Sequence, residues 1–340
     1  ERHRRDDPVT MFEHDTYPEL KRGTVSPAEM SIAPENNFTN ILVLRELESH
    51  AIFTTDGQSA DLASVAVGSG DDRETYSPGL MFMRKQTGSD RRFAKSLQRD
   101  LLDIDCTMQV NGMCQDCVEC ILYGSAASDD ADQALSITSR VMYDTAYTVR
   151  DATVAIDEKF QNAPGDDYAK EAEATIREPD FFEPGTLFPA VITLRDATPE
   201  ELAFVLGITA KNKRYGAATS RLGRVKNHIL GVYTGSEEGP ANLGLTRDTI
   251  QQLRDDENTS YDSIQDVITA SAHDPELVGE HLGAAFEERV DAERGGLNLT
   301  RVPEETIDDL LAAATGEELA ELLTEQRGAS QAFRAQSEEE

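Results

Sequence analysis

The sequence predicts an α+β fold, in which a small core of strands and helices precedes a helical C-terminal region. Three observations support this prediction. A buried apolar strand at residues 190–194 is followed at once by Thr198-Pro199-Glu200-Glu201, a capping box with proline at the first helical position. Another apolar strand, residues 225–233, follows a basic loop at residues 212–223. After Pro240 the pattern of apolar residues and helix-start signals becomes helical.

The elements before this unit are predicted from local composition. Residues 1–37 contain four prolines and are expected to be an extended lead-in. Alternating apolar residues predict one or two strands within 41–53, and glycines and prolines make 57–79 rich in loops. A helix is expected from about Ser89, with Asp90 in its first turn, where a carboxylate suits the helix dipole.

The central region is predicted to form the core of the fold. Thr, Val and Tyr are frequent in 137–156, which favours strands, and the helix that begins at Pro199 is expected to end at Gly207. Strand, capped helix, basic loop and strand make half of a split β-α-β unit, as found in ferredoxin-like and RNA-recognition folds. We therefore expect a modified fold of this type in three parts. A discontinuous core comprises residues 38–80 and 130–238, a basic segment with a cysteine-bearing insertion comprises 81–129, and an acidic helical region comprises 240–335.

The charge of the chain is strongly negative. It has 32 Lys and Arg residues against 64 Asp and Glu residues, a formal charge of −32, and no Trp. Such an excess normally argues against a nucleic-acid partner, because phosphate binding depends on cations. It is also typical of proteins from salt-accumulating microbes, in which surface carboxylates keep the chain hydrated. For a halophilic source, the informative feature is where acidic residues are missing.

Two basic segments stand out against this acidic background. Residues 202–236 contain no Asp or Glu, and 84–99 holds six cations against the single Asp90. A charge run is usually a solvated helix face, but cations retained in an acidic chain favour a polyanionic partner. Glycines in the loop allow close approach of the backbone to phosphate, and Tyr215 is expected to stack on a base. The predicted RNA-binding residues are Arg84, Lys85, Arg91, Arg92, Lys95, Arg140, Arg150, Lys213, Arg214, Tyr215, Arg221, Arg224, Lys226 and His228.

All four cysteines lie within fifteen residues, at Cys106, Cys114, Cys117 and Cys120. Cys-x2-Cys turns direct two thiolates to one point, and a zinc ion takes four such ligands in a tetrahedron. The turn at Asn111-Gly112 is expected to bring Cys106 back to the other three. An iron–sulfur cluster is the alternative, although the further Cys-Pro of the bacterial ferredoxin run is missing. The prediction is a structural Zn²⁺ site, because four cysteines leave no position for a substrate.

The sequence offers no convincing active site. It has no Walker A loop, no Gly-x-Gly-x-x-Gly after a strand, no His-Glu-x-x-His and no nucleophile elbow. Apolar runs near 18 residues are absent, and so is a cationic-then-apolar leader, so we expect a cytoplasmic protein without a membrane partner. A non-catalytic protein is predicted.

The order of several short motifs is similar to a known family. This order resembles the backbone subunit of type I-D CRISPR surveillance complexes, a member of the RAMP superfamily, over about residues 38–235. The motifs are Met113-Cys114 to Cys120-Ile121-Leu122-Tyr123-Gly124, Ser139-Arg140-Val141, Tyr143-Asp144-Thr145-Ala146-Tyr147, Pro184-Gly185-Thr186-Leu187-Phe188-Pro189, Arg214-Tyr215-Gly216-Ala217, Arg221-x-Gly223-Arg224-Val225 and Asn227-His228-Ile229.

The resemblance implies a non-catalytic subunit that binds CRISPR guide RNA and assembles in several copies along it. Its implied partners are guide RNA, the target strand paired to the guide, further copies in a helical filament, and other subunits of the complex. A projecting hairpin would interrupt the RNA at intervals, and residues 57–79 and 155–186 are the candidates. Two alternatives remain: a stand-alone zinc-stabilised single-stranded RNA-binding protein, and an iron–sulfur electron carrier or enzyme.

Overall fold

The main sheet carries the architecture of the chain. The structure, a computed structural model, describes residues 10–126, 136–157, 160–161, 176–177, 179–216, 222–292 and 297–337. Its largest sheet has the order β14-β15-β1-β13-β7, with every neighbouring pair antiparallel, and β16 pairs with the far end of β15. The mixed helix-and-sheet fold predicted from the sequence is confirmed. These strands are β1 (Phe38–Leu47), β7 (Val141–Tyr143), β13 (Leu187–Arg195), β14 (Arg214–Tyr215), β15 (Gly223–Gly235) and β16 (Leu299–Arg301).

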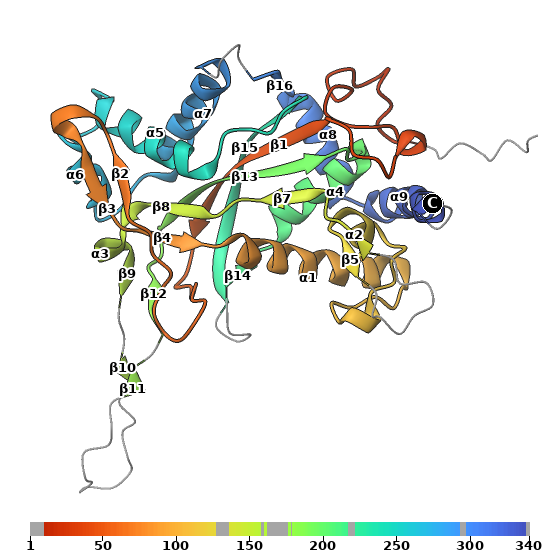
Figure 1. Cartoon of the computed structure of the whole chain (residues 1–340), viewed down its shortest axis with the longest axis horizontal. Coiled ribbons are helices and arrows are strands. Elements are labelled where there is room, and N and C mark those ends of the chain that lie inside the picture. The colour runs from red at the N-terminus through yellow and green to blue at the C-terminus, as the bar shows by residue number, and fades with distance from the viewer. Residues whose placement is uncertain are drawn as a thin grey trace, which may run out of the picture.

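Two helices connect the four principal strands. Helix α1 (Met83–Leu102) lies between β1 and β7 in the chain, and α4 (Pro199–Lys211) lies between β13 and β15. If these strands are numbered 1 to 4 in chain order, as β1, β7, β13 and β15, their order across the sheet is 4-1-3-2. Apolar side chains of α1 and α4 belong to one core cluster, so both helices pack on the same face of the sheet (Figure 1).

Helices cover both faces of the sheet. On β1, Ile41 and Val43 pack toward α4, α8 (Glu304–Thr315) and α9 (Leu319–Ser337). The alternate residues Leu42 and Leu44 pack toward α5 (Asn242–Asp255), α6 (Ile264–Ile268) and α7 (Pro275–Ala292). Successive side chains of a strand point to opposite faces, so a strand covered on both sides is a continuous apolar run. An open sheet face on which bases could stack is therefore not present along β1.

The N-terminus of α4 confirms the capping box, but its C-terminus differs from the prediction. Thr198 Oγ1 accepts from the Glu201 N–H at 3.1 Å, and the Glu201 carboxylate accepts from the Thr198 N–H at 3.0 Å. The helix continues through Gly207 to Lys211. A Cβ at Gly207 would lie 2.8 Å from the Cβ of Ala314 on α8, so this glycine allows two helices to approach closely. It does not end the helix.

Helix α1 also begins earlier than predicted. It starts at Met83, directly after β4 (Pro78–Met81), so Asp90 lies in its interior and not in its first turn. Asp90 is fully buried. The expected helix-dipole role of Asp90 is therefore wrong, and its carboxylate needs other partners.

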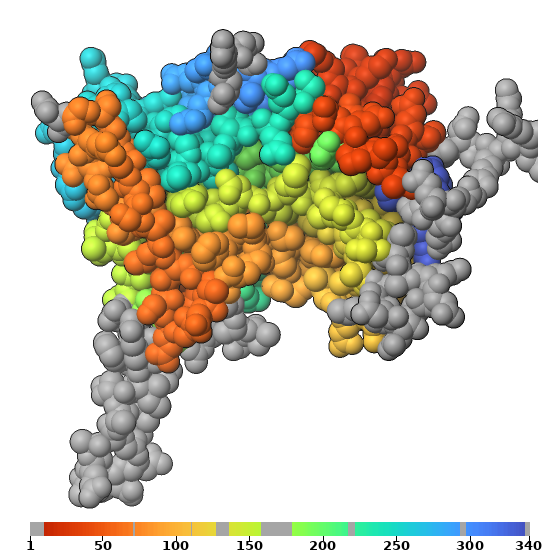
Figure 2. Space-filling view, viewed as in Figure 1, coloured from red at the N-terminus to blue at the C-terminus, as the bar shows by residue number. Residues whose placement is uncertain are grey.

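Several two-stranded ladders extend from the core. Figure 2 shows the red N-terminal residues packed at the end of the molecule opposite to the orange residues of β2 and β3. Both candidate projecting segments contain antiparallel pairs: β2–β3 in 57–79, and β9–β12 with β10–β11 in 155–186, part of which lies outside the described residues (Figure 1). The pairs are β2 (Val65–Val67) with β3 (Glu74–Tyr76), β4 with β8 (Ala146–Asp151), β5 (Ser125–Ala126) with β6 (Ser136–Ile137), β9 (Ile156–Asp157) with β12 (Phe181–Phe182), and β10 (Phe160–Gln161) with β11 (Ile176–Arg177).

The region after Pro240 is helical, as predicted, apart from β16. Helix-start signals in the sequence predict starts at Thr246, Asp274-Pro275, Pro303-Glu304-Glu305 and Thr315-Gly316-Glu317-Glu318. Helices α7 and α8 begin as predicted, at Pro275 and Glu304, and α9 begins at Leu319, whereas α5 begins at Asn242, four residues before Thr246. Because α5 to α9 pack on the two sheet faces, the region contributes directly to the core. No helix among the described residues is long and apolar enough to cross a membrane. The short remaining helix α3 spans Ala152–Ala155.

Strand β15 is an edge strand with protection at its two ends. Strand β14 pairs with Gly223 and Arg224, and β16 pairs with residues 233–235. Between these ends, no described strand pairs with the outer side of residues 226–231. Opposite β1, Leu230 is the extra residue of a β-bulge, which bends the strand and increases its twist.

Candidate nucleic-acid interface and metal site

The two basic segments lie against each other in the fold. The Ser89 hydroxyl of α1 donates to the backbone carbonyl of Arg214 on β14. Beside it, the Asn212 amide donates to Asp90 Oδ1 at 2.7 Å. Figure 1 shows β14 and the adjoining end of β15 extending past α1. Segments more than one hundred residues apart in the sequence therefore pack against each other.

A buried carboxylate fastens the two segments together. Asp90 accepts hydrogen bonds from the Tyr215 hydroxyl at 2.6 Å, the Asn212 amide at 2.7 Å and the Tyr143 hydroxyl at 2.8 Å. Three donors satisfy a charge that would be costly to bury alone. Burial, and then the charge of Asp90, raise the pKa of Tyr215, so this hydroxyl keeps its proton and donates. The hairpin formed by β14 and β15 is thus attached to α1 through Asp90, which binds Tyr215 of β14 and Asn212 at the end of α4.

Arg45 completes this network from the centre of β1. Its side chain is fully buried and donates to Asn227 Oδ1 at 2.7 Å and to Gln86 Oε1 at 3.2 Å. The guanidinium also lies 5.0 Å from the centre of the Tyr215 ring. Burial by itself lowers the pKa of Arg45, but Tyr215 and Asp90 more than offset this and raise it. Arg45 is not among the residues predicted from the sequence, although a lone Arg in an apolar strand is a recognisable signal of such a network.

Six predicted RNA-binding cations remain accessible and without a carboxylate partner within 4.0 Å among the described residues. Two of them, Arg84 and Lys85, occupy the first turn of α1, which has no acidic residue and no side-chain cap. Cations are unfavourable at this positive end of the helix dipole, and an anion bound there would offset the cost. Burial, and then Arg84, lower the pKa of Lys85. The six are Arg84, Lys85, Arg92, Lys213, Arg214 and Lys226; we call them the open cations.

Three further predicted residues are paired with acidic side chains. Arg91 Nε lies 2.5 Å from Glu119 Oε1. Arg224 Nε lies 2.8 Å from Glu48 Oε2, and His228 Nε2 lies 2.7 Å from Glu46 Oε2. An RNA phosphate would have to compete with these carboxylates for the same donors. They are weaker candidates than the open cations.

Four predicted residues have structural roles, so the predicted RNA contact is corrected for them. Tyr215 is 0% exposed and cannot stack on a base in this conformation. Lys95 is 1% exposed and lies in the cysteine cluster. Arg150 is buried, donating to Ser271 O at 2.6 Å, and both terminal nitrogens of Arg140 bind the Glu201 carboxylate, at 2.8 and 2.5 Å. The remaining candidate, Arg221, lies outside the described residues.

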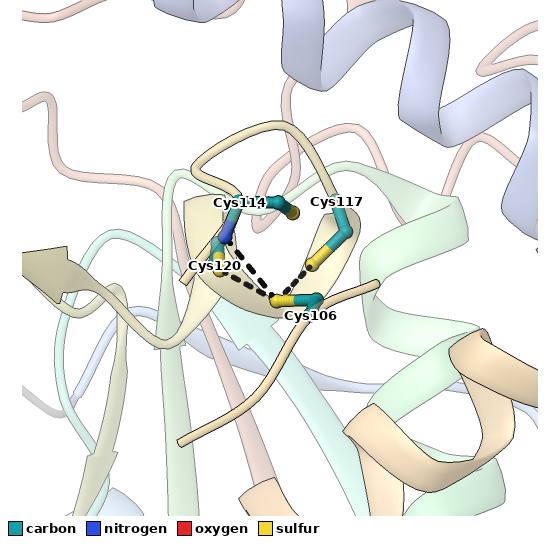
Figure 3. A group of neighbouring side chains, drawn as sticks. All are labelled: Cys106, Cys114, Cys117 and Cys120. Atoms are coloured by element: carbon teal, nitrogen blue, oxygen red, sulfur yellow. Dashed lines mark hydrogen bonds between the residues drawn. The ribbon is translucent and has the colours of Figure 1, made fainter. Parts of the chain in front are cut away.

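The four cysteines form a compact cluster, as predicted. Their Sγ atoms all lie within 4.8 Å of one another. Cys106 Sγ is 3.5 Å from Cys120 Sγ and 3.8 Å from Cys117 Sγ, and Figure 3 shows these three thiols directed toward one another. This group can hold a metal ion.

Local backbone structure explains how the thiols converge. Cys117 is the N-cap of α2 (Val118–Leu122) and Cys120 lies in the first turn, which places both side chains at the helix start. A turn closed by the Thr107 N–H and the Gly112 carbonyl at 2.8 Å returns the chain beside Cys106. The turn predicted at residues 111–112 is therefore present, within the 3-10 helix at Val110–Gly112.

Two cations of α1 contact the cysteine cluster. Lys95 Nζ lies 3.0 Å from Cys106 Sγ and 3.2 Å from Cys120 Sγ, and it pairs with Glu119 Oε2. Arg99 donates to the Cys106 carbonyl at 2.8 Å. Hydrogen bonds from the other thiols, and to a lesser degree from Lys95, lower the pKa of Cys106 and favour its thiolate, the form that binds metals.

Comparison with known proteins identifies the family. A family model described as "Csc2 Crispr" matches residues 20–292. The chain belongs to the Csc2 CRISPR family. The search of curated proteins found no match to this chain.

Three solved structures match this Csc2-family chain, and the first of them shares its fold. One, described as "Crystal structure of Thermofilum pendens Csc2", has a TM-score of 0.63 at 17% identity, covering 96% of this chain and 94% of that chain. Another, described as "Type IV-B CRISPR Complex", has a TM-score of 0.39 at 14% identity, over 57% and 90% of the two chains. A third, "CRISPR RNA-guided surveillance complex, pre-nicking", has a TM-score of 0.38 at 11% identity, over 73% and 100%.

Proposed function

We propose that this chain is a non-catalytic backbone subunit of a type I-D CRISPR complex, which binds guide RNA with little sequence preference. One observation carries the proposal. In a chain of net charge −32, the fold packs two distant basic segments against each other and leaves six of their cations without carboxylate partners among the described residues. Cations that touch phosphates fix position without reading bases, as a guide-holding protein requires.

We propose that the core is a modified ferredoxin-like fold. The 4-1-3-2 order of antiparallel strands, with α1 and α4 as connecting helices, supports this assignment. Because helices cover both sheet faces, RNA would run along α1 and the β14–β15 hairpin and not across the sheet. In this arrangement the helical C-terminal region supports the sheet, and α7, which borders the hollow beside Lys226, is its part nearest to the RNA.

Zinc is the metal that the cysteine cluster fits best. A tetrahedron of sulfurs about 2.3 Å from a zinc ion has edges of about 3.8 Å, close to the separations of 3.5 and 3.8 Å in the cluster. A four-iron cluster would keep its thiolates farther apart, because each binds a different iron. With all four ligands supplied by cysteine, the zinc would be structural and would fold residues 103–126 onto α1.

The proposed subunit acts with several partners. Copies of the chain would assemble side by side along one guide RNA in a helical filament, in the cytoplasm of a salt-accumulating organism. A projecting hairpin of each copy would contact the guide and the target strand paired to it, and the hairpin with the β9–β12 stem is our candidate. The other subunits of the complex would complete the assembly at its ends and along its length.

Sequencing of RNA that co-purifies with the chain, expressed in a host that carries a CRISPR array, tests the proposal. We expect RNAs of variable sequence that share one constant segment derived from the repeat. A protein in which Lys213, Arg214 and Lys226 are changed to Gln should retain much less RNA while folding normally. RNAs without a common segment would favour the stand-alone RNA-binding alternative, and absence of RNA would refute both functions.

A further inference from the structure

Lys95 is a buried cation for which an RNA interface has no use. It belongs to the basic run of α1, yet only 1% of it is exposed. An ammonium removed from water needs acceptors for its protons. Lys95 finds them in the sulfurs of Cys106 and Cys120, at 3.0 and 3.2 Å, and in the carboxylate of Glu119.

We propose that Lys95 is a positioning residue of the metal site, where its ammonium offsets the charge of the metal-bound thiolates and fixes two of the four ligands. This inference rests on the zinc site put forward as part of the proposed function. It assigns to the residue an outer-shell role in metal binding in place of the RNA contact predicted from the sequence. It also makes α1 a part of the metal site.

The charges around the cluster favour this role. Four thiolates on a divalent ion carry two net negative charges, and the buried carboxylate of Glu119 adds a third. Three cations of α1 match them: Lys95, Arg91, which binds Glu119 at 2.5 Å, and Arg99, which donates to the Cys106 carbonyl at 2.8 Å. Of these three, only Lys95 contacts the sulfurs. Charges that water does not screen need such compensation, so Lys95 should favour the thiolate form of the loaded site.

A change of Lys95 to Met tests the inference. Methionine has a similar length and no charge, and loss of an outer-shell partner typically lowers metal affinity by about 10–100-fold. We expect Lys95→Met to weaken zinc binding to this extent, measured on the purified full-length protein by competition with a chromophoric chelator. Its cobalt-substituted form should keep the absorption bands of thiolate coordination, because all four cysteines remain. The matched control is Arg92→Met, on the exposed side of the same helix, which should bind zinc as the wild type does.

A second variant separates this role from a merely structural ion pair. If Lys95 served only to neutralise Glu119, then Glu119→Gln would weaken zinc binding as much as Lys95→Met. We expect instead that Glu119→Gln binds zinc at least as tightly as the wild type, because the ammonium is then shared by the sulfurs alone. In the double variant the buried carboxylate and its partner are removed together, which protects the fold, and zinc binding should still weaken by about 10-fold or more.

The outcomes that contradict the inference are distinct. Equal zinc affinity for the wild type and for Lys95→Met would overturn the role of Lys95 and leave the zinc site intact. A wild-type protein that binds neither zinc nor cobalt would overturn the zinc site itself, and the role of Lys95 with it. RNA retention, measured on the same proteins, is independent of both results.

Discussion

The slope of RNA affinity against salt concentration should report how many cations contact phosphate. For single strands, log affinity falls with log salt with a slope of about −0.7 for each phosphate contact. Six open cations predict a slope of about −4, which is a loss of about four decades of affinity between 0.1 and 1 M salt. Changing Lys213, Arg214 and Lys226 to Gln removes three contacts, so the slope should fall to about −2. The assay is fluorescence anisotropy with an unstructured RNA of one subunit footprint, repeated across a salt series.

A control of equal charge makes this experiment decisive. Arg195, Arg254 and Arg289 are each paired with a carboxylate, and none of them is a predicted RNA-binding residue. Changing these three to Gln alters the net charge of the chain by the same amount, and we expect the wild-type slope. The reasoning is refuted if the first variant keeps a slope near −4, or if the control loses as much slope as the first variant.

Four further predictions follow from the structure. An RNA of several footprints should bind more tightly per site than one of a single footprint, because neighbouring copies cooperate; equal affinities per site would favour a monomeric protein. Chelation of the metal should raise hydrogen exchange in 103–126 while the sheet stays protected, and protection lost in both regions would argue against a local role. Gly207→Ala should lower the unfolding free energy by about 1–3 kcal/mol, because the added methyl group overpacks against Ala314. Gly283→Ala, where nothing lies within 4 Å of the added atom, should raise it by up to about 1 kcal/mol. Denaturant titration compares the two variants, and equal effects would refute the close-packing argument. Burial, and then Arg150, lower the pKa of His273 to about 4, so below pH 6.5 the unfolded chain binds a proton that the folded chain does not. This group should therefore lower the unfolding free energy by about 2 kcal/mol between pH 7 and 5, and His273→Gln should remove that decrease. The decrease would be absent if the ring were accessible to water.

Local signals in the sequence located the strands, the capping box and the cysteine cluster. Each of these depends on residues close together in the chain. The thiols converge through one turn and one helix start, and the capping box needs only Thr198 and Glu201. For such features the spacing contains most of the geometry.

The roles of individual cations could not be predicted in the same way. Arg84, Arg91, Lys95 and Arg99 follow one another at intervals of seven, four and four residues, the pattern of a single solvated helix face. The structure divides this face, because residues 103–126 fold back and cover part of it, so that Lys95 is enclosed while Arg84 stays exposed. Periodicity describes one helix alone and contains no information about which later segment packs on it.

Tyr215 shows the same limit from the opposite direction. A tyrosine between basic residues and glycines is the composition of a stacking platform, yet its hydroxyl binds Asp90 and its ring faces Arg45. These three residues lie 45 or more positions apart in the sequence. A buried polar network of this kind is specified by the tertiary fold and cannot be inferred from neighbours in the chain.

The open stretch of β15 has a practical consequence for protein samples. Unpaired backbone groups on an edge strand can recruit a strand of another molecule and begin aggregation, and charged side chains and bulges oppose this. Lys226, His228 and the bulge at Leu230 lie along this stretch. A variant that neutralises Lys226 therefore removes one charge that opposes edge-to-edge association between copies. Turbidity in such a sample would report association of edges, and light scattering should accompany every measurement on it.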